Sequence, residues 1–491
     1  MSIFFKLLIL FFLLKWFFKK IWNRIIYRIL PKNPKFLWLD RLNKLWLMIQ
    51  PQDPNSRRFM IYMLVGLGIF LLAFFFRNTA IIKGIENEGI DTLMQNRQEI
   101  IPSNPTIPSF VLLDIDDNTH QAWNEPMFTP RDRVLNLITA AVNVQARLVI
   151  IDIDLSRKTP MDGLDKYTKG LKHHPYDQAL FDYLSGYKAA CSHKPCPPII
   201  LARSFKSSFS SLHNTRPSFL DEAVQQSKPY VQWASTLFFR DEDTIRYWSL
   251  WQPACSVQQP TVIPSIQLLA AGLIRNGIKH QTAGLKQELQ YFQPQDCFGT
   301  ATKHLPPENI QIGKLTVNTG QHGIQQRIMF SIPWKVHNNK NIKYSLKDKT
   351  GKTIISIFPA KEFAKLPLTA NLEALKNSIV VIGGSYSGGH DIHLTPLDEM
   401  PGVLIIINAI HTLLEYGEIQ PLPNWLKILI YFALLVLSCL VLARFGYGRG
   451  LIIPFILIFV VLILSSIFLF HYGIWLYFML PLSVIMQLLP L

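Results

Sequence analysis

Acidic side chains follow short apolar runs at three places in this 491-residue chain. In a parallel sheet the carboxyl ends of the strands meet at one edge, and ligands collect beyond that edge. If the three runs are neighbouring strands, the polar side chains that follow them face one crevice, together with an arginine that begins a predicted helix. The candidate ligand-binding residues of this crevice are Asp116, Arg131, Asp152, Asp391 and His393.

Carboxylates and imidazoles of this kind suit a polar or cationic ligand, or a divalent metal held by oxygen and nitrogen. A second interpretation is structural, because aspartates also cap helices and bind loop amides and arginines such as Arg131 or Arg133. The sequence leaves both open and identifies neither a metal nor a cofactor. A metallohydrolase built on Asp116, Asp152, Asp391 and His393 is a third hypothesis.

Catalytic motifs give little support to an enzyme. The chain contains no GxSxG, no HExxH and no complete nucleophile set. Ser385, Asp391 and either His390 or His393 form a triad by composition, but residues this close on one loop rarely reach the geometry of a triad. The glycine-rich GGSYSGG (383–389) lacks both the Lys-Ser/Thr of a phosphate loop and the GxGxxG spacing. We therefore predict a protein without enzymatic activity.

A strand–helix–strand pattern begins the polar part of the chain. Residues 109–116 and 147–154 are almost continuously apolar, and residues 131–144 between them have helical periodicity after Pro130. This pattern predicts a buried parallel unit and an α/β domain with a mainly parallel sheet. Other expected segments are strands at 198–202 and 378–383, an exposed edge strand at 245–250, a strand or helix start within 402–415, and loops over 203–228 and much of 284–308.

Long apolar runs flank the polar part. One precedes it and three follow it, each about 18–20 residues long, enough for a helix to cross a ~30 Å hydrocarbon layer. We expect four transmembrane α-helices and an exported domain at 77–424. The predicted spans are 59–76, 425–443, 451–470 and 474–491.

Charge predicts the orientation of these spans. Residues 1–58 hold 12 basic and 2 acidic residues, so this segment contributes +10 of the formal net charge of +16. Basic residues favour the cytoplasmic side, and the loop 444–450 adds two arginines there. We read the charge as a topology signal and expect no nucleic-acid partner. This orientation places the large domain outside the cytoplasm.

The N-terminal segment mixes aromatic and basic residues over 3–22. Such a segment suits a helix in the membrane interface, and a fifth span remains open as the alternative. Together with the charge of residues 1–58, it predicts a basic, amphipathic cytoplasmic or membrane-surface segment, with the bilayer as its partner.

Four of the five cysteines fall in the expected exported domain, and Cys439 falls in the second predicted span. An even number of exported cysteines suggests two disulfides, and four cysteines allow three pairings. Since a short turn-like segment separates Cys191 from Cys196, we favour Cys191–Cys196 with Cys255–Cys297. A zinc site that includes His193 is the weaker alternative, because CxxxxC is not a common zinc spacing.

The order of these segments resembles the second class of bacterial CHASE extracellular sensory domains. The likeness rests on four segments, of which the last is the most specific: VLLDIDD (111–117), PRDRVLNLITAAVNVQARLVIIDID (130–154), DEDTIRYWSL (241–250) and IVVIGGSYSGGHDIHLTPLDEMPGVLIIINAIHTLL (379–414). Thr244 stands where that pattern has glycine. The resemblance implies a sensory role and suits one span before the domain and three after it. Together with the predicted topology, it implies a bacterial inner membrane as the location, with the large domain in the periplasm or outside the cell.

Members of that family usually continue into a cytoplasmic output domain, whereas this sequence ends with the fourth predicted span. We therefore expect a sensor that signals to a separate effector of the cyclase or kinase type, with a homodimer as one arrangement. The alternative is a structural subunit of a membrane complex, whose exported domain is a docking surface.

Overall fold

We describe the protein from a computed structural model, which divides into two compact units, residues 1–93 with 420–491 and residues 94–419. The structure describes residues 53–76, 80–96, 104–161, 173–192, 195–206, 212–298, 307–313, 315–320, 324–334, 344–348, 350–364, 372–445, 460–461, 464–470 and 473–476. The predicted interface segment at 3–22 lies outside these residues.

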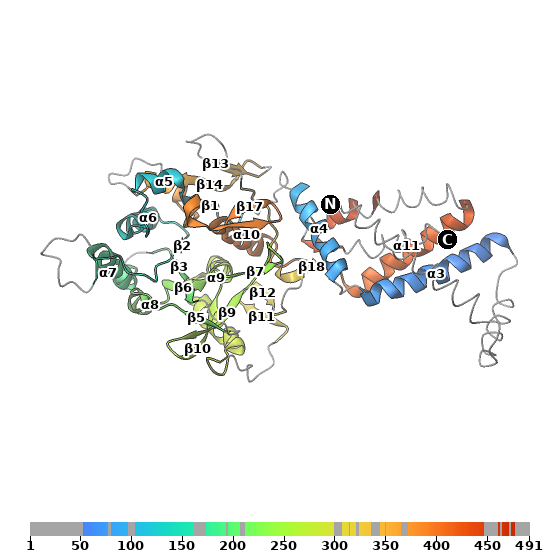
Figure 1. Cartoon of the computed structure of the whole chain (residues 1–491), viewed down its shortest axis with the longest axis horizontal. Coiled ribbons are helices and arrows are strands. Elements are labelled where there is room, and N and C mark those ends of the chain that lie inside the picture. The colour runs from blue at the N-terminus through green and yellow to red at the C-terminus, as the bar shows by residue number, and fades with distance from the viewer. Residues whose placement is uncertain are drawn as a thin grey trace. The chain divides into compact units, whose positions relative to one another are not determined.

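The unit at 94–419 is built on a seven-stranded sheet in the order β13-β14-β1-β15-β2-β3-β6 (Figure 1). All neighbours are parallel except the edge pair β13–β14, so the prediction of a mainly parallel sheet is confirmed. The strands are β1 (Phe110–Ile115), β2 (Leu148–Asp152), β3 (Ile199–Arg203), β6 (Val231–Ser235), β13 (Tyr344–Lys347), β14 (Thr353–Pro359) and β15 (Ile379–Gly384).

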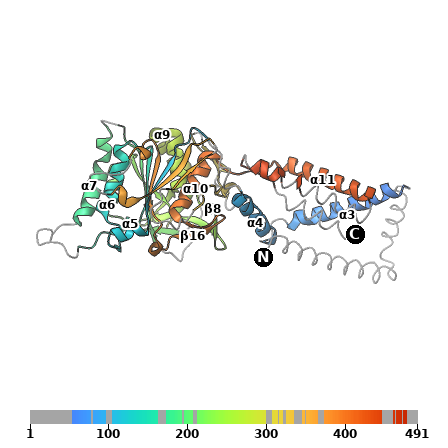
Figure 2. The same cartoon turned by 90° about the horizontal axis from the view of Figure 1, so that it is seen from above.

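Helices cover both faces of this sheet, which explains why its inner strands read as continuous apolar runs. One face packs against α6 (Arg131–Asn143), α7 (Pro175–Ala190) and α8 (Asp221–Gln226). The other packs against α9 (Ile266–Leu289) and α10 (Gly402–Glu415), as Figure 2 shows. Because side chains alternate along a strand, Val111 and Leu113 face the first layer, and Leu112 and Asp114 face the second.

The three strands expected to carry the crevice are neighbours. β15 lies between β1 and β2, and Gly383 is in register with Asp114 on one side and with Asp152 on the other. The two aspartates therefore point to the same face of the sheet, with a glycine between them. This arrangement brings the acidic strand ends to one edge, as the sequence predicts.

Smaller sheets surround the main one. They have the orders β10-β9-β5-β4, β17-β16-β8-β7 and β11-β12. Their strands are β4 (Phe205–Lys206), β5 (His213–Thr215), β7 (Phe238–Asp241), β8 (Thr244–Trp248), β9 (Trp251–Ser256), β10 (Gln259–Pro264), β11 (Asn309–Ile312), β12 (Leu315–Asn318), β16 (Ile392–Thr395) and β17 (Asp398–Pro401).

The local predictions for these regions need correction. The expected edge strand at 245–250 is the inner strand β8, which has neighbours on both sides. The expected loop at 203–228 contains β4, β5 and α8, and the expected loop at 284–308 begins with the last turns of α9. Short strands with many polar residues lack the apolar alternation on which the prediction relied. Residues 402–415 are helical throughout, although a strand start was allowed.

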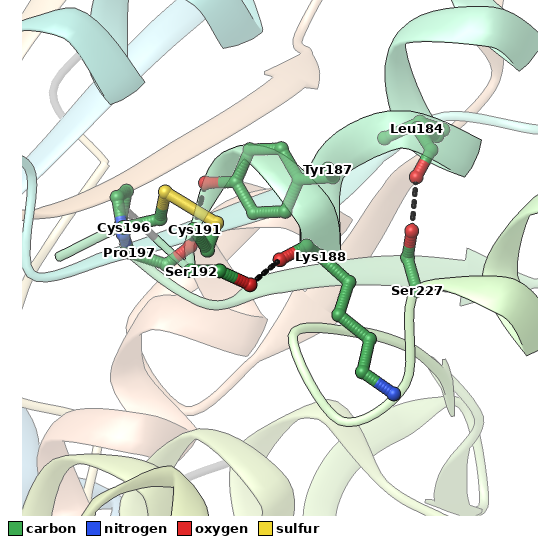
Figure 3. Close-up of a disulfide and its surroundings, with 8 residues drawn as sticks. All are labelled: Leu184, Tyr187, Lys188, Cys191, Ser192, Cys196, Pro197 and Ser227. Atoms are coloured by element: carbon green, nitrogen blue, oxygen red, sulfur yellow. Dashed lines mark hydrogen bonds between the residues drawn. A yellow bond between two sulfur atoms is a disulfide. The ribbon is translucent and has the colours of Figure 1, made fainter. Parts of the chain in front are cut away.

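Both predicted disulfides are present. Cys191 and Cys196 pair, as do Cys255 and Cys297, each with a Cα–Cα distance of 5.3 Å. Cys191 is the C-cap of α7, and Cys196 lies shortly before β3. In Figure 3 the Tyr187 hydroxyl, one turn before Cys191, donates to the Pro197 carbonyl at 2.8 Å. The first disulfide and this hydrogen bond together tie the end of α7 to the start of β3.

Removing the two disulfides should have unequal effects. Their cysteines are 5 and 42 residues apart, and the constraint on the unfolded chain grows with loop length. We expect Cys255→Ala/Cys297→Ala to lower the free energy of unfolding by about 2 kcal/mol more than Cys191→Ala/Cys196→Ala does. Urea unfolding of the full-length variants in detergent measures this. Equal losses, or a larger loss for the short loop, would show that native-state packing and not loop length sets the contribution.

The other unit contains α3 (Pro54–Phe76) and α11 (Asn424–Phe445), which pack against each other. A side chain added at Gly66 would collide with Leu435, so glycine permits this close approach. The unit also holds the strand pair β18 (Gln420–Pro421) and β19 (Ile474–Trp475). Helix α4 (Ala80–Asn96) connects α3 with residues 94–419 along the chain.

The prediction of four membrane spans is supported in part. Among the residues described, one helical stretch, Asn424–Val441 in α11, is long and apolar enough to cross a membrane. It coincides with the second predicted span. The first predicted span lies within α3, and the third and fourth fall largely outside the described residues. The other three therefore stay predictions.

Candidate functional site

Asp391 and His393 lie in a chain of side-chain hydrogen bonds. The Arg240 guanidinium on β7 lies 3.0 Å from Nδ1 of His393, and Nε2 of His393 lies 2.8 Å from Oδ1 of Asp391. An arginine only donates, so Nδ1 of His393 accepts and Nε2 carries the proton that the aspartate accepts. Arg240 thereby sets the tautomer of His393 that supports Asp391.

Asp391 also lies against the beginning of α10. The Gly402 amide donates to the Asp391 carbonyl at 2.9 Å, and Gly402 is the first residue of the helix. A Cβ at this position would collide with the Asp391 carboxylate, so glycine lets the carboxylate reach the helix start. A negative charge is stabilised there by the helix dipole. The structure thus explains the Pro-Gly at 401–402: Pro401 is the N-cap and Gly402 makes room for Asp391.

Asp152, at the end of β2, is the third member of this group. Burial, and to a lesser extent the nearby Asp391 carboxylate, raises the pKa of Asp152 to about 7. Two neighbouring carboxylates repel each other unless a proton or another cation lies between them. The group of Arg240, His393, Asp391 and Asp152 is therefore suited to a cationic ligand or to a change in protonation.

Asp114 occupies a separate position on the same face of the sheet. A Cβ at Gly383, the glycine between Asp114 and Asp152, would collide with Val403 of α10, so Val403 packs over the strand between the two aspartates. Asp114 is 4% exposed and accepts a hydrogen bond of 2.7 Å from the Ser385 hydroxyl at Oδ2. Its Oδ1 is buried and has no hydrogen-bond partner among the described residues.

Desolvation governs the charge of Asp114. Burial raises its pKa to about 7, the Ser385 hydrogen bond opposes this, and the charges of Asp116 and Asp117 add to it. Deprotonation would place negative charge on the buried Oδ1, which has no hydrogen bond to stabilise it. The protonated form is therefore the natural state of this side chain at mildly acidic pH.

The other two predicted site residues make local structural contacts. Oδ1 of Asp116 accepts the Thr119 amide at 2.8 Å and caps α5 (Asp117–Ala122). Arg131 is 1% exposed, and its guanidinium donates to the carbonyls of three residues. These are Thr129, Asp154 and Arg157, each at 3.1 Å. Neither Asp116 nor Arg131 makes a hydrogen bond or ion pair with Asp152, Asp391 or His393, so the predicted set divides into two groups.

Sequence reasoning missed several residues of this edge. The amide and hydroxyl of Ser387 both donate to Asp117 at 2.9 Å, and the rings of His120 and Tyr386 stack with centroids 4.3 Å apart. These contacts tie the glycine-rich loop after β15 to α5, the short helix after β1. Arg240 was also missed, because it comes from a strand about 150 residues before its partner in the chain. The only available signal was its position just before the acidic turn DEDT (241–244).

The described residues contain no group of three or more His, Cys, Asp or Glu side chains placed to hold a metal ion.

Comparison with known families gives one match. The model of the CHASE2 domain matches residues 66–443, which is more than half of the chain. No curated protein and no solved structure matches the chain.

Proposed function

The chain belongs to the CHASE2 domain family, a family of extracellular sensory domains, and we propose that it is an integral membrane sensory protein. In this proposal the domain at 77–424 lies outside the cytoplasm and recognises a cationic ligand or partner group. It passes the resulting shift across the membrane to a separate effector. Asp152, Asp391 and His393 form the recognition site.

The observation that carries the proposal is the contact between Asp391 and α10. Asp391 lies against Gly402 at the start of α10, and the chain continues from the end of this helix to α11, the described helix that can cross a membrane. A cation that draws Asp391 towards Asp152 would change the contact of Asp391 with α10. A ligand can shift an equilibrium only by binding its two states unequally, and this contact offers such a difference.

Membrane insertion in the proposal rests on α11 and on the distribution of charge. The basic segment before residue 59, Arg444 in the last turn of α11 and Arg449 just after it favour the cytoplasm. We propose that these residues flank the inner face of a bacterial inner membrane, with three further spans at 59–76, 451–470 and 474–491. The effector would be of the cyclase or kinase type, and a homodimer would bring two such effectors together.

The substitution Asp391→Asn tests the recognition site, because it removes the charge and keeps the size. We expect the full-length variant to fold and insert normally but to lose the rise in melting temperature that organic diamines or guanidinium compounds give the parent. A ligand at 100 times its dissociation constant stabilises by about 2.7 kcal/mol, so the parent's shift should be several degrees. Differential scanning fluorimetry in detergent, over a panel of these cations, measures it.

The exposed Asp398, the first residue of β17, supplies the matched control. Asp398→Asn should respond to the cations as the parent does. A cation-induced shift retained by Asp391→Asn would reject the site. A variant that melts several degrees lower without any selective loss would make Asp391 a structural residue. That second outcome, with copurification of a stoichiometric membrane complex, would favour the alternative of a docking subunit.

A further inference from the structure

The chain between α10 and α11 is short and held at both ends. Helix α10 ends at Glu415, and Gly417 adopts a positive φ of 69°, the conformation in which glycine commonly ends a helix. Eight residues then lead from Tyr416 to the start of α11 at Asn424. The hydrogen bonds of this connector, residues 416–423, differ on the two sides of Ile419.

The first half of the connector is bound within the unit at 94–419. The Glu418 side chain is 6% exposed, and its Oε1 accepts the Asn318 amide of β12 at 2.7 Å. Just upstream, the Arg275 guanidinium of α9 donates to the carbonyls of Leu413 and Leu414 at 3.2 and 2.7 Å. These are carbonyls of the last helical turn, which lack partners inside the helix. The end of α10 is thus fixed to α9 and β12.

The second half is bound within the other unit. The Gln420 amide donates to the Gly473 carbonyl at 2.8 Å, and β18 pairs in parallel with β19, with Gln420 opposite Ile474 and Pro421 opposite Trp475. The turn that carries β19 is well packed: Trp475 is 0% exposed and its ring meets that of Phe470 edge-on at 6.1 Å. Leu422 and Leu476 form a small apolar cluster beside this pair.

Between the two sets of contacts stands a single residue, Ile419, which is itself 0% exposed. An extended residue spans at most about 3.6 Å, so the connector has little slack between Glu418 and Gln420. A displacement of the end of α10 therefore reaches β18 through the backbone. From β18 it has two routes, along the chain into α11 and across hydrogen bonds into the turn Gly473–Leu476.

We propose that residues 418–422 are a mechanical coupler that delivers one displacement both to α11 and to the turn Gly473–Leu476. The predicted third span ends just before this turn and the predicted fourth span begins within it, so the coupler would move the three closing spans together. The inference rests on the proposed function for its direction, from domain to membrane. The coupling itself needs no ligand.

A cysteine pair tests the register and the coupling. In the full-length protein, Gln420→Cys/Ile474→Cys places two cysteines on neighbouring strands, whose backbones lie about 4.8 Å apart. We expect a disulfide to form on mild oxidation in native membranes. A pair in which the first cysteine is shifted by four residues, Asn424→Cys/Ile474→Cys, should react at least about tenfold more slowly. Failure of the first pair to react would overturn the proposal at once.

The coupling is then measured by hydrogen exchange on the same variant. Oxidation of the pair should slow exchange at residues 413–418 about tenfold, because fixing one end of the coupler restrains the other. Conversely, Glu418→Ala should speed exchange at 473–476 by a similar factor. Glu418→Gln should not, since its amide oxygen still accepts the Asn318 amide. Unchanged exchange at 413–418 after oxidation would show that the two ends are independent.

These outcomes are distinguishable from a failure of the proposed function. If hydrogen exchange shows coupling but cations cause no shift in melting temperature, the proposed sensor function is rejected and the coupler stands. If cations cause the shift but exchange shows no coupling, the coupler is rejected and the sensor function stands. The oxidised and reduced forms of the cysteine pair are the same folded protein. Their exchange rates can therefore be compared even if Glu418→Ala prevents folding.

Discussion

Replacing Asn408 by leucine should lower the free energy of unfolding by about 3–5 kcal/mol, one of the two largest effects that we expect in this molecule. Asn408 lies in the middle of α10 and is 0% exposed. Its Oδ1 accepts the amides of Ser331 and Ile332 at 3.0 and 2.9 Å, and its Nδ2 donates to the carbonyls of Ile332 and Leu404, both at 3.0 Å.

The loss is large because residues 328–332 depend on α10 for these bonds. This segment carries buried Ile328, Met329, Phe330 and Ile332, and Thr412 binds both the amide and the carbonyl of Met329. A leucine has the same number and branching of non-hydrogen side-chain atoms as asparagine, but it would leave buried backbone groups without partners, at about 1–3 kcal/mol each. Urea unfolding of the full-length protein in detergent, followed by tryptophan fluorescence, measures the loss.

The same substitution at Asn143 supplies the control, because Asn143 is exposed at the end of α6. We expect Asn143→Leu to change the stability by less than about 0.5 kcal/mol. A loss below about 1 kcal/mol for Asn408→Leu would contradict the assignment of these hydrogen bonds. If the hydroxyl hydrogen bonds of Thr412 and not its packing hold residues 328–332, Thr412→Ser should lower the free energy of unfolding less than Thr412→Val does.

The central strands of the fold could be predicted from sequence because they are buried on both faces. An inner parallel strand such as β1, β2 or β15 has only apolar surroundings until it ends, so its sequence is continuously apolar and then turns acidic. The helix α6 between the first two strands was equally clear from its apolar periodicity. These elements carry the candidate site, which is why its location at one sheet edge followed from the residues alone.

The division of the site could not be predicted, because it depends on contacts between distant segments. Nothing near Asp116 indicates that its carboxylate turns back to the Thr119 amide, and nothing near Arg131 indicates that three loop carbonyls surround its guanidinium. Likewise, the link from Arg240 to His393 joins residues 153 apart in sequence. Only the packing of β7, β8 and β16 into one small sheet brings them together.

The second large effect concerns pH and Asp114. The folded-state pKa of Asp114 is raised to about 7 from an ordinary 3.8, so folding favours its protonated form. Its contribution to stability is therefore complete below about pH 4 and is lost as the pH rises through 7. At about 1.4 kcal/mol per pKa unit, the loss amounts to at most about 4 kcal/mol by pH 8.

Asp114→Asn is expected to remove this dependence, because asparagine stays neutral like the protonated acid. Near pH 4 the variant should be slightly less stable than the parent, since the amide nitrogen that replaces Oδ1 brings two N–H donors to a buried position without a partner among the described residues. At pH 8 it should be more stable. Between pH 4 and pH 8, the free energy of unfolding of the variant should therefore rise relative to that of the parent by up to about 4 kcal/mol.

Urea unfolding of full-length parent and variant at half-unit pH steps measures this difference, in which the other titrating groups largely cancel. Asp398→Asn, at an exposed position, should follow the parent at every pH. Ser385→Ala should make the loss of stability continue to a higher pH than in the parent, because the hydroxyl hydrogen bond lowers the folded-state pKa of Asp114. A constant difference between Asp114→Asn and parent would show that Asp114 is charged in the fold, and that a group not yet identified compensates the charge at Oδ1.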